Sequence, residues 1–150
     1  MPKGNLMIEI LLSCSTLLSV GLMPHKDYTD TLDALFLEMP ENNLLLDLEF
    51  ITSDIDKTIA EINIYCAEHD IDFAAFGQFL MKGLKKAYSD SGTDIKDFAD
   101  KVYAIWNMLP SSIQTAEPFW TMNYGDDPLS WGDIEQTKEL YEKMLRFYNG

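Results

Sequence analysis

Cysteine and histidine are the residue types in this chain that could bind a transition metal or act as a nucleophile. Cys66 and His69 are three residues apart in an expected helix, a spacing that could hold one side of a zinc ion. Cys14 and His25 are the only other residues of these types, so a zinc site would need all four. Cys66, however, lies in an apolar helical stripe, which is typical of a buried structural thiol, and the helix dipole accounts for His69 near a C-terminus. We therefore predict no metal site and no cysteine nucleophile.

Paired carboxylates could bind Mg²⁺ or Ca²⁺ or serve in acid–base catalysis. Asp27, Asp30 and Asp33 share one expected helix, but their spacing spreads them around it, whereas a cation site needs converging oxygens. The tripeptide DID occurs at Asp54–Asp56 and Asp70–Asp72 without the glycine and distant glutamate of a calcium loop, which favours a role at helix starts. The sequence also lacks phosphate-binding glycine loops and the HExxH and GxSxG motifs. We expect a protein that is not an enzyme and holds no cofactor.

The segment EPFWTMNYGDDPLSWGD, Glu117 to Asp133, combines carboxylates with aromatic rings and contains no basic residue. Its prolines and glycines predict an irregular connection of about 14 residues, and loops of that length are often functional. Trp and Tyr are frequent anchors of protein interfaces, and the carboxylates would select Arg or Lys on a partner. The alternative is that the two tryptophans fold back to close the core. The residues predicted to bind a partner are Glu117, Trp120, Tyr124, Asp126, Asp127, Trp131 and Asp133.

The elements that would position these residues are helices, because apolar residues recur at helical spacing along most of the chain. The spacing predicts an all-α fold, a single-domain bundle of about six helices covering residues 1–150. The expected helices cover residues 7–20, 27–39, 55–69, 72–88, 95–109 and 134–148. The run from Leu44 to Ile51 favours a further short helix, and an α+β fold with a short strand there is the alternative.

Residues that could cap these helices stand before several of them. Ser53 with Asp56, and Ser130 with Asp133, resemble capping boxes, in which a serine side chain accepts a hydrogen bond from a backbone N–H in the first turn. Thr93 and Asp72 are the candidate caps of two other helices.

The formal net charge of −14 is concentrated in particular segments. Residues 23–72 contain 13 acids and two lysines, and residues 102–133 contain four acids and no basic residue. Such a charge disfavours direct binding to nucleic acid or to an anionic membrane, both of which require clustered Lys and Arg. It favours a basic protein partner, whose encounter would be accelerated by electrostatic steering. Residues 23–72 are the second candidate for the interface.

The apolar stretch from Ile10 to Pro24 could indicate a membrane segment or a signal peptide. Its 15 residues are too few to span a bilayer as a helix, and Glu9 interrupts the apolar region that a signal peptide needs. We expect it to form a buried first helix. Two cysteines are too few for a disulfide framework, which favours a reduced, cytoplasmic protein.

The chain length, its acidity and the segment NYGDDPLSWGD, Asn123 to Asp133, together resemble the immunity proteins of bacterial polymorphic toxin systems, including contact-dependent growth inhibition. The resemblance implies a non-catalytic protein that binds a cognate basic toxin, often a nuclease, and blocks its active site. Such proteins share no common fold, so the resemblance assigns no residue.

Two other functions are compatible with the same composition. An acidic nucleic-acid mimic or adaptor, regulating a host or phage protein, would engage several basic proteins through the same kind of surface. A metal- or acid-dependent enzyme would instead lose its activity with a single carboxylate.

Overall fold

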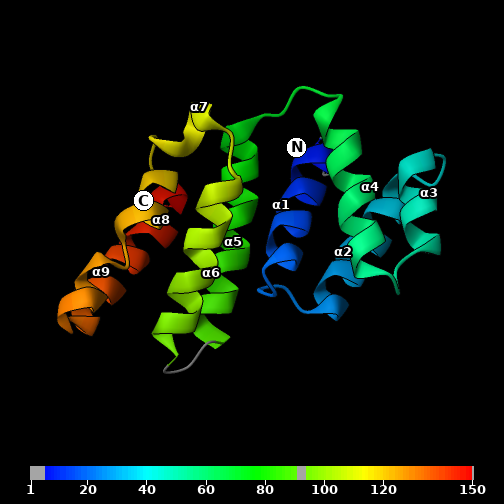
Figure 1. The fold of residues 1–150 in the computed structure, drawn as a ribbon. Helices are drawn as coiled ribbons and strands as arrows, with labels where there is room; N and C mark the ends of the chain where they lie inside the picture. Colours follow the sequence, from blue (N-terminus) through cyan, green and yellow to red (C-terminus); the bar gives the residue numbers. More distant parts are fainter. Residues whose placement is uncertain (1–5, 91–93, 150) are drawn as a thin grey trace. The chain divides into compact units, whose positions relative to one another are not determined.

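The computed structural model describes residues 6–90 and 94–149, which are largely helical and contain no strand (Figure 1). The predicted all-α fold is confirmed. The α-helices of these residues are α1 (Met7–Ser19), α2 (His25–Glu38), α3 (Asn43–Phe50), α4 (Ile55–Ala67), α5 (Phe73–Asp90), α6 (Ile95–Met108), α7 (Ser111–Gln114), α8 (Phe119–Tyr124) and α9 (Ile134–Leu145). The 3-10 helices η2 (Asp127–Trp131) and η3 (Phe147–Asn149) lie on either side of α9.

The described residues therefore form nine α-helices, and the predicted number of about six is too low because short helices occupy the connections. The run from Leu44 to Ile51, for which a strand was the alternative, belongs mostly to α3. Its start is capped by the side chain of Asn42, which accepts a hydrogen bond from the N–H of Leu45 at 3.0 Å. Leu45 and Leu48 are buried at helical spacing, whereas a strand would bury alternate residues.

Aspartates cap the starts of four longer helices. The carboxylates of Asp54, Asp72, Asp94 and Asp133 accept hydrogen bonds of 3.0–3.1 Å from backbone N–H groups in the first turns of α4, α5, α6 and α9. The predictions that Asp72 and the tripeptide Asp54–Asp56 lie at helix starts are therefore confirmed. The predicted caps Ser53 and Ser130 are wrong, and Thr93 lies outside the described residues. A carboxylate also interacts favourably with the helix dipole, so part of the acid content stabilises helices.

The chain divides into two compact units, residues 1–79 and 80–150, and the boundary falls inside α5. The single domain expected from the chain length stays a prediction.

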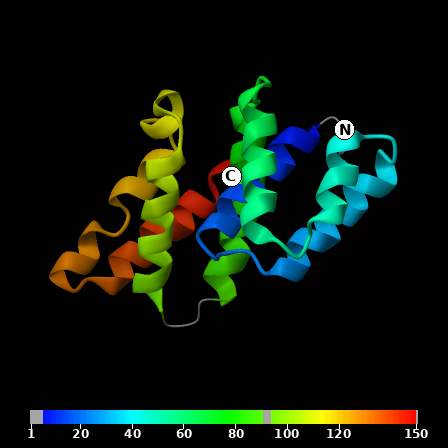
Figure 2. The same ribbon diagram turned by 45° about the vertical axis from the view of Figure 1, so that its right-hand side comes forward.

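In the first unit α1 packs along α4 and α2 packs against α3 (Figures 1 and 2). The largest fully buried side chains of this unit are those of Leu11, Leu17, Tyr28, Leu32, Leu35, Leu45, Leu48, Ile62 and Phe76. The expected first helix is confirmed as α1, and most of its side chains are buried.

In the second unit α6 packs against α8, and α8 packs against α9 (Figure 2). The ring of Phe98 on α6 lies in the middle of the unit, with its centroid 5.3 Å from that of Tyr88 and 5.5 Å from that of Tyr141. Both are edge-to-face contacts, the geometry that aromatic rings favour in protein cores. The packing of α6, α8 and α9 positions the segment that carries the predicted site.

Candidate functional site

The segment from Glu117 to Asp133 is mostly helical, and the predicted irregular connection is wrong. It forms α8 and then η2, separated by Gly125 and Asp126. Its helix-breaking residues stand at helix ends, where they are tolerated: Pro118 precedes α8, and Gly132 follows η2 with a φ of 79°. The site is therefore presented by short helices, whose side chains have defined directions.

Four aromatic side chains form a continuous row across α6 and α8, which we call the aromatic row: Tyr103, Trp106, Trp120 and Tyr124. Consecutive ring centroids in this order lie 6.1, 6.0 and 6.3 Å apart. The row is partly exposed, with relative exposures of 41% for Tyr103 and 38% for Trp120. Large aromatic side chains that remain this accessible are typical anchors for a protein partner.

The middle of the row is held in place by hydrogen bonds to the turn after α6. The indole N–H of Trp106 donates to the carbonyl oxygen of Gln114 at 3.0 Å, and the side-chain amide of Gln114 donates back to the carbonyl oxygen of Trp106 at 3.0 Å. This pair of hydrogen bonds fixes the orientation of Trp106, on which Tyr103 and Trp120 pack. A preorganised row loses little side-chain entropy on binding.

Three carboxylates from α6 and the α8–η2 connection form an acidic cluster: Asp100, Asp126 and Asp127. Burial and then the charges of Asp127 and Asp100 raise the pKa of Asp126, although Lys96 and a backbone hydrogen bond oppose the shift. Burial, followed by the charges of Asp126, Asp100 and Asp127, raises the pKa of the Tyr141 phenol. Lys96 is 3.4 Å from Asp100. The cluster thus concentrates negative charge that this single lysine only partly compensates.

The close packing of α8 against α9 depends on Gly125. A Cβ atom at this position would lie 2.6 Å from Cε1 of Tyr141 and 2.9 Å from the carbonyl oxygen of Thr121. Such distances are shorter than van der Waals contact, so only glycine fits without a shift of the helices. Gly125 therefore allows the chain to pass close to Tyr141, and the charge of the next residue, Asp126, acts on the Tyr141 phenol.

Two of the predicted partner-binding carboxylates also stabilise the segment itself. Oε1 of Glu117 accepts hydrogen bonds from the backbone N–H and the hydroxyl of Thr121, at 3.1 and 2.7 Å. Asp133 caps α9 through a hydrogen bond of 3.0 Å from the N–H of Gln136. Both residues have a structural role, and their contact with a partner stays a prediction.

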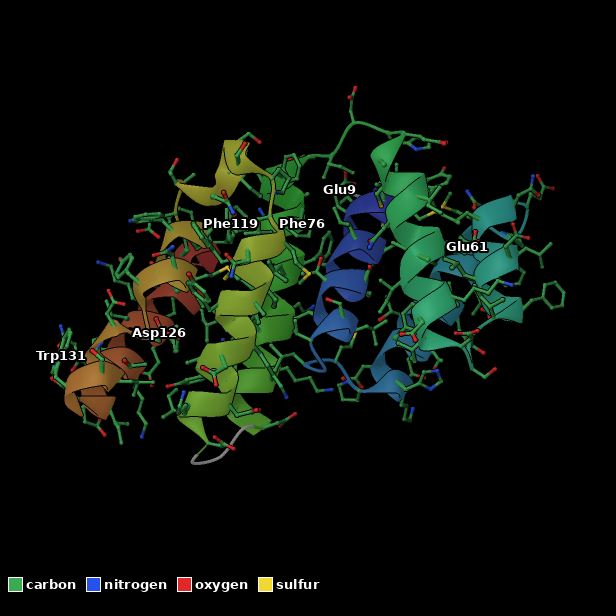
Figure 3. The ribbon with its side chains drawn as sticks, viewed as in Figure 1. Glu9, Glu61, Phe76, Phe119, Asp126 and Trp131 are labelled. Carbon is green, nitrogen blue, oxygen red and sulfur yellow. The ribbon has the colours of Figure 1, made fainter. Side chains whose placement is uncertain are left out.

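Trp131 ends η2 and is 64% exposed, close in sequence to Ile134, which is 46% exposed. Figure 3 shows it at the outer end of the orange segment, beyond Asp126. Within the described residues its ring makes no ring-to-ring contact, so it is not part of the aromatic row. The alternative prediction, that both tryptophans of the segment fold back to close the core, is wrong for Trp131.

The structure therefore brings Trp120 and Tyr124 together with Tyr103 and Trp106, and Asp126 and Asp127 together with Asp100. The three residues on α6 were missed as site residues. Their spacing of three residues, from 100 to 103 to 106, places them along neighbouring turns of one helix and is the signal that could have found them.

The two cysteine thiols and the metal-binding side-chain types can be examined in the described part of the chain. Burial raises the pKa of Cys14 to about 12 and, together with the charge of Glu9, that of Cys66 to about 11, so both thiols are protonated at neutral pH. Among the described residues no group of three or more His, Cys, Asp or Glu side chains has the arrangement of a metal site. None of the helices described is both long and apolar enough to cross a bilayer.

The chain was compared with protein-family models, curated proteins and solved structures, and none of them matched it.

Proposed function

We propose that this protein is a non-catalytic binding protein whose α6–α8 surface recognises a basic protein partner. The observation that carries the proposal is that the aromatic row and the acidic cluster share α6, where Tyr103 and Asp100 stand one turn apart, and that the cluster continues directly after α8 at Asp126. Exposed aromatic rings would anchor the partner, and the carboxylates would select its Arg or Lys side chains.

The electrostatic state of the cluster supports a cationic partner. The raised pKa of Asp126 means that its ionised form is disfavoured in the folded protein. A guanidinium or ammonium group placed beside Asp126 would favour the ionised carboxylate and so offset the effects of burial and of the charges of Asp127 and Asp100. Arg side chains can also stack on Trp and Tyr, so the same partner residue could contact both parts of the surface.

The most specific form of the proposal is an immunity protein that acts in the cytoplasm and neutralises a cognate basic toxin, a nuclease, by covering its active site. The active site of a nuclease must attract phosphate and is therefore positively charged. The acidic cluster would occupy the phosphate-binding groove, while the aromatic row would slow dissociation.

The proposal is tested by capturing partners on the immobilised full-length protein, followed by elution along a salt gradient. Two variants change the site: Trp120→Ser, and Asp126→Lys combined with Asp127→Lys. A matched control, Asp90→Lys combined with Glu139→Lys, changes the net charge equally at exposed positions elsewhere in the second unit.

We expect one basic protein that the wild type and the control retain beyond physiological salt and that both site variants lose. Its nuclease activity should then fall when an equimolar amount of the wild-type protein is added. Retention that falls equally for the control would show that only net charge matters and would contradict the proposal. A retained partner without nuclease activity would favour the adaptor function instead.

A further inference from the structure

The face formed by α2 and α3 in the first unit carries apolar side chains that this fold does not bury. Leu37 and Phe50 are each 80% exposed, and Leu46 is 40% exposed. The same two helices already bury other leucines against the core, among them Leu35 and Leu48. Single exposed leucines are ordinary, but three large apolar groups on two adjacent helices form a patch of the kind that marks interaction surfaces.

The side chains of Asp33 on α2 and Glu49 on α3 lie within hydrogen-bonding reach and show how the two helices align. The helices are joined by a short turn and pack side by side, so they run in opposite directions (Figure 1). Leu37 stands one turn beyond Asp33, and Leu46 stands one turn before Glu49, so both leucines lie toward the connecting turn. Phe50 follows Glu49 directly. The apolar groups therefore flank a pair of carboxyl groups.

The charge around this patch is almost entirely negative. Residues 25–50 contain seven acids and one lysine, Lys26. Lys26 forms an ion pair with Asp30 at 2.8 Å. Burial, followed by the hydrogen bond and the charge of Asp33, also raises the pKa of Glu49 to about 7. The two carboxyl groups thus favour a shared proton, and a cation between them would replace that proton.

We propose that the α2–α3 face is a docking surface for a basic amphipathic helix of another protein. The apolar side of that helix covers Leu37, Leu46 and Phe50, and its Arg or Lys side chains reach Asp33 and Glu49. A helix is the natural occupant because two adjacent antiparallel helices present a shallow groove, and apolar anchors spaced one turn apart match the repeat of a third helix. This docking surface is independent of the function proposed for α6–α8.

Charge complementarity decides between a foreign helix and a second copy of this chain. Two copies meeting through this face would bring the Asp33 and Glu49 carboxyl groups of one copy toward those of the other, within segments that each contain seven acids and one lysine. Repulsion between like charges opposes that association at neutral pH, whereas a basic helix turns the same charges into an attraction.

The experiment uses a synthetic helical peptide of about 18 residues, composed of leucine and lysine with the leucines on one face. A second peptide of the same composition has the leucines scattered. Binding to the full chain is measured by calorimetry at physiological salt, and the site is mapped by amide chemical-shift changes.

The variants are Leu37→Ser combined with Phe50→Ser, the matched control Ile64→Ser in the same unit, and Trp120→Ser. Ile64 is 62% exposed on α4, so its replacement removes a comparable exposed apolar group.

We expect the amphipathic peptide to shift amides of α2 and α3, and the double variant to bind it at least about tenfold more weakly, while Ile64→Ser and Trp120→Ser bind it normally. Far-ultraviolet circular dichroism should be unchanged, because both replaced side chains are largely exposed. The proposal is overturned if the peptide does not bind, if the scattered peptide binds equally well, or if only Trp120→Ser weakens binding. It is also overturned if sedimentation shows a dimer that the double variant abolishes, since the occupant would then be a second copy.

Discussion

The buried carboxylate of Glu9 accepts a hydrogen bond at 3.0 Å from the backbone N–H of Asp72, the residue before α5. The carboxylate of Asp72 in turn accepts hydrogen bonds from the N–H groups of Ala74 and Ala75, each at 3.1 Å. The start of α5 is therefore held by a side chain from α1 as well as by its own cap. A buried carboxylate without a hydrogen-bond donor is costly, and this hydrogen bond offsets part of the cost of placing Glu9 at a position that is 6% exposed.

Replacing Glu9 with Ala should lower the free energy of unfolding by about 1–3 kcal/mol, because the part-buried hydrogen bond from the N–H of Asp72 to a carboxylate is lost. Glu9→Gln keeps an acceptor oxygen and should lose clearly less. Urea denaturation followed by circular dichroism measures both values. Equal losses for the two variants would show that the hydrogen bond does not stabilise the start of α5.

Substitutions at Gly125 and Gly132 should distinguish lack of space from backbone strain. Gly125→Ala places a methyl group against Tyr141 and should cost about 1–3 kcal/mol, and Gly125→Asn should cost more. Gly132 has open space around it but a positive φ, so Gly132→Asn should be tolerated better than Gly132→Ala. The unfolding free energies of the four variants test this, and the same order at both positions would contradict it.

Asp126→Asn should increase the free energy of unfolding at neutral pH. Burial and the neighbouring charges of Asp127 and Asp100 raise the pKa of Asp126, so above that pKa the folded state carries an ionised group in a less favourable environment than the unfolded state does. A neutral isostere removes this penalty. The exposed Asp127→Asn variant serves as the control and should have a smaller effect. A decrease in the stability of Asp126→Asn would show that its charge has a stabilising partner in the fold.

The stability of the protein should include a pH-dependent contribution from Glu49. Its pKa rises from the ordinary value of 4.5 to about 7, through burial first and then through Asp33, while Tyr28 is the other titratable group that interacts with it. Between these two pH values the folded state binds more protons than the unfolded state, so this contribution falls as the pH rises. Unfolding free energies measured from pH 4.5 to 7.5 should decline less steeply for Glu49→Gln. Parallel curves for the two proteins would refute the assignment.

Substitutions of Asp133 can separate its cap from its predicted contact with a partner. Asp133→Ala removes the acceptor for the N–H of Gln136 and should cost about 1 kcal/mol, whereas Asp133→Ser keeps a capping oxygen without the charge. If the carboxylate also contacts the partner, Asp133→Ser should weaken capture while its melting temperature stays near that of the wild type. Equal destabilisation by Ala and Ser would contradict the capping role.

The long helices could be predicted from the sequence because their apolar spacing is regular and each buries one face. Of the short helices, α3 was the favoured prediction for Leu44 to Ile51 and is confirmed. The short helix α8 could not be predicted, since proline and glycine indicate a break without showing on which side of it a helix lies. Pro118 and Gly125 stand at the two ends of α8 and do not interrupt it, so a helical segment was predicted to be a loop. The caps were misassigned for a related reason: Ser53 and Asp54 are both good capping residues, and only the backbone conformation decides between them.

Only the part of the candidate site that is contiguous in the sequence, residues 117–133, could be predicted. The aromatic and acidic residues of 117–133 are visible as a compositional cluster, but their neighbours on α6 depend on which helix packs against α8. Trp106 lies on the apolar side of α6, where helical spacing favours a core position. The structure instead leaves it half-buried, because the chain from Gln114 to Trp120 covers only part of its ring.

The boundary between the two units has a practical consequence for dissecting this protein, because it passes through an 18-residue helix. A chain cut between Phe79 and Leu80 would divide α5 into pieces that are too short to be stable helices on their own. Each half would also expose the side chains with which its part of α5 contributes to a core, including Phe76 on one side and Leu80 and Leu84 on the other. Deletion mapping of either surface would therefore produce insoluble fragments, and point substitutions in the intact chain are the appropriate tool.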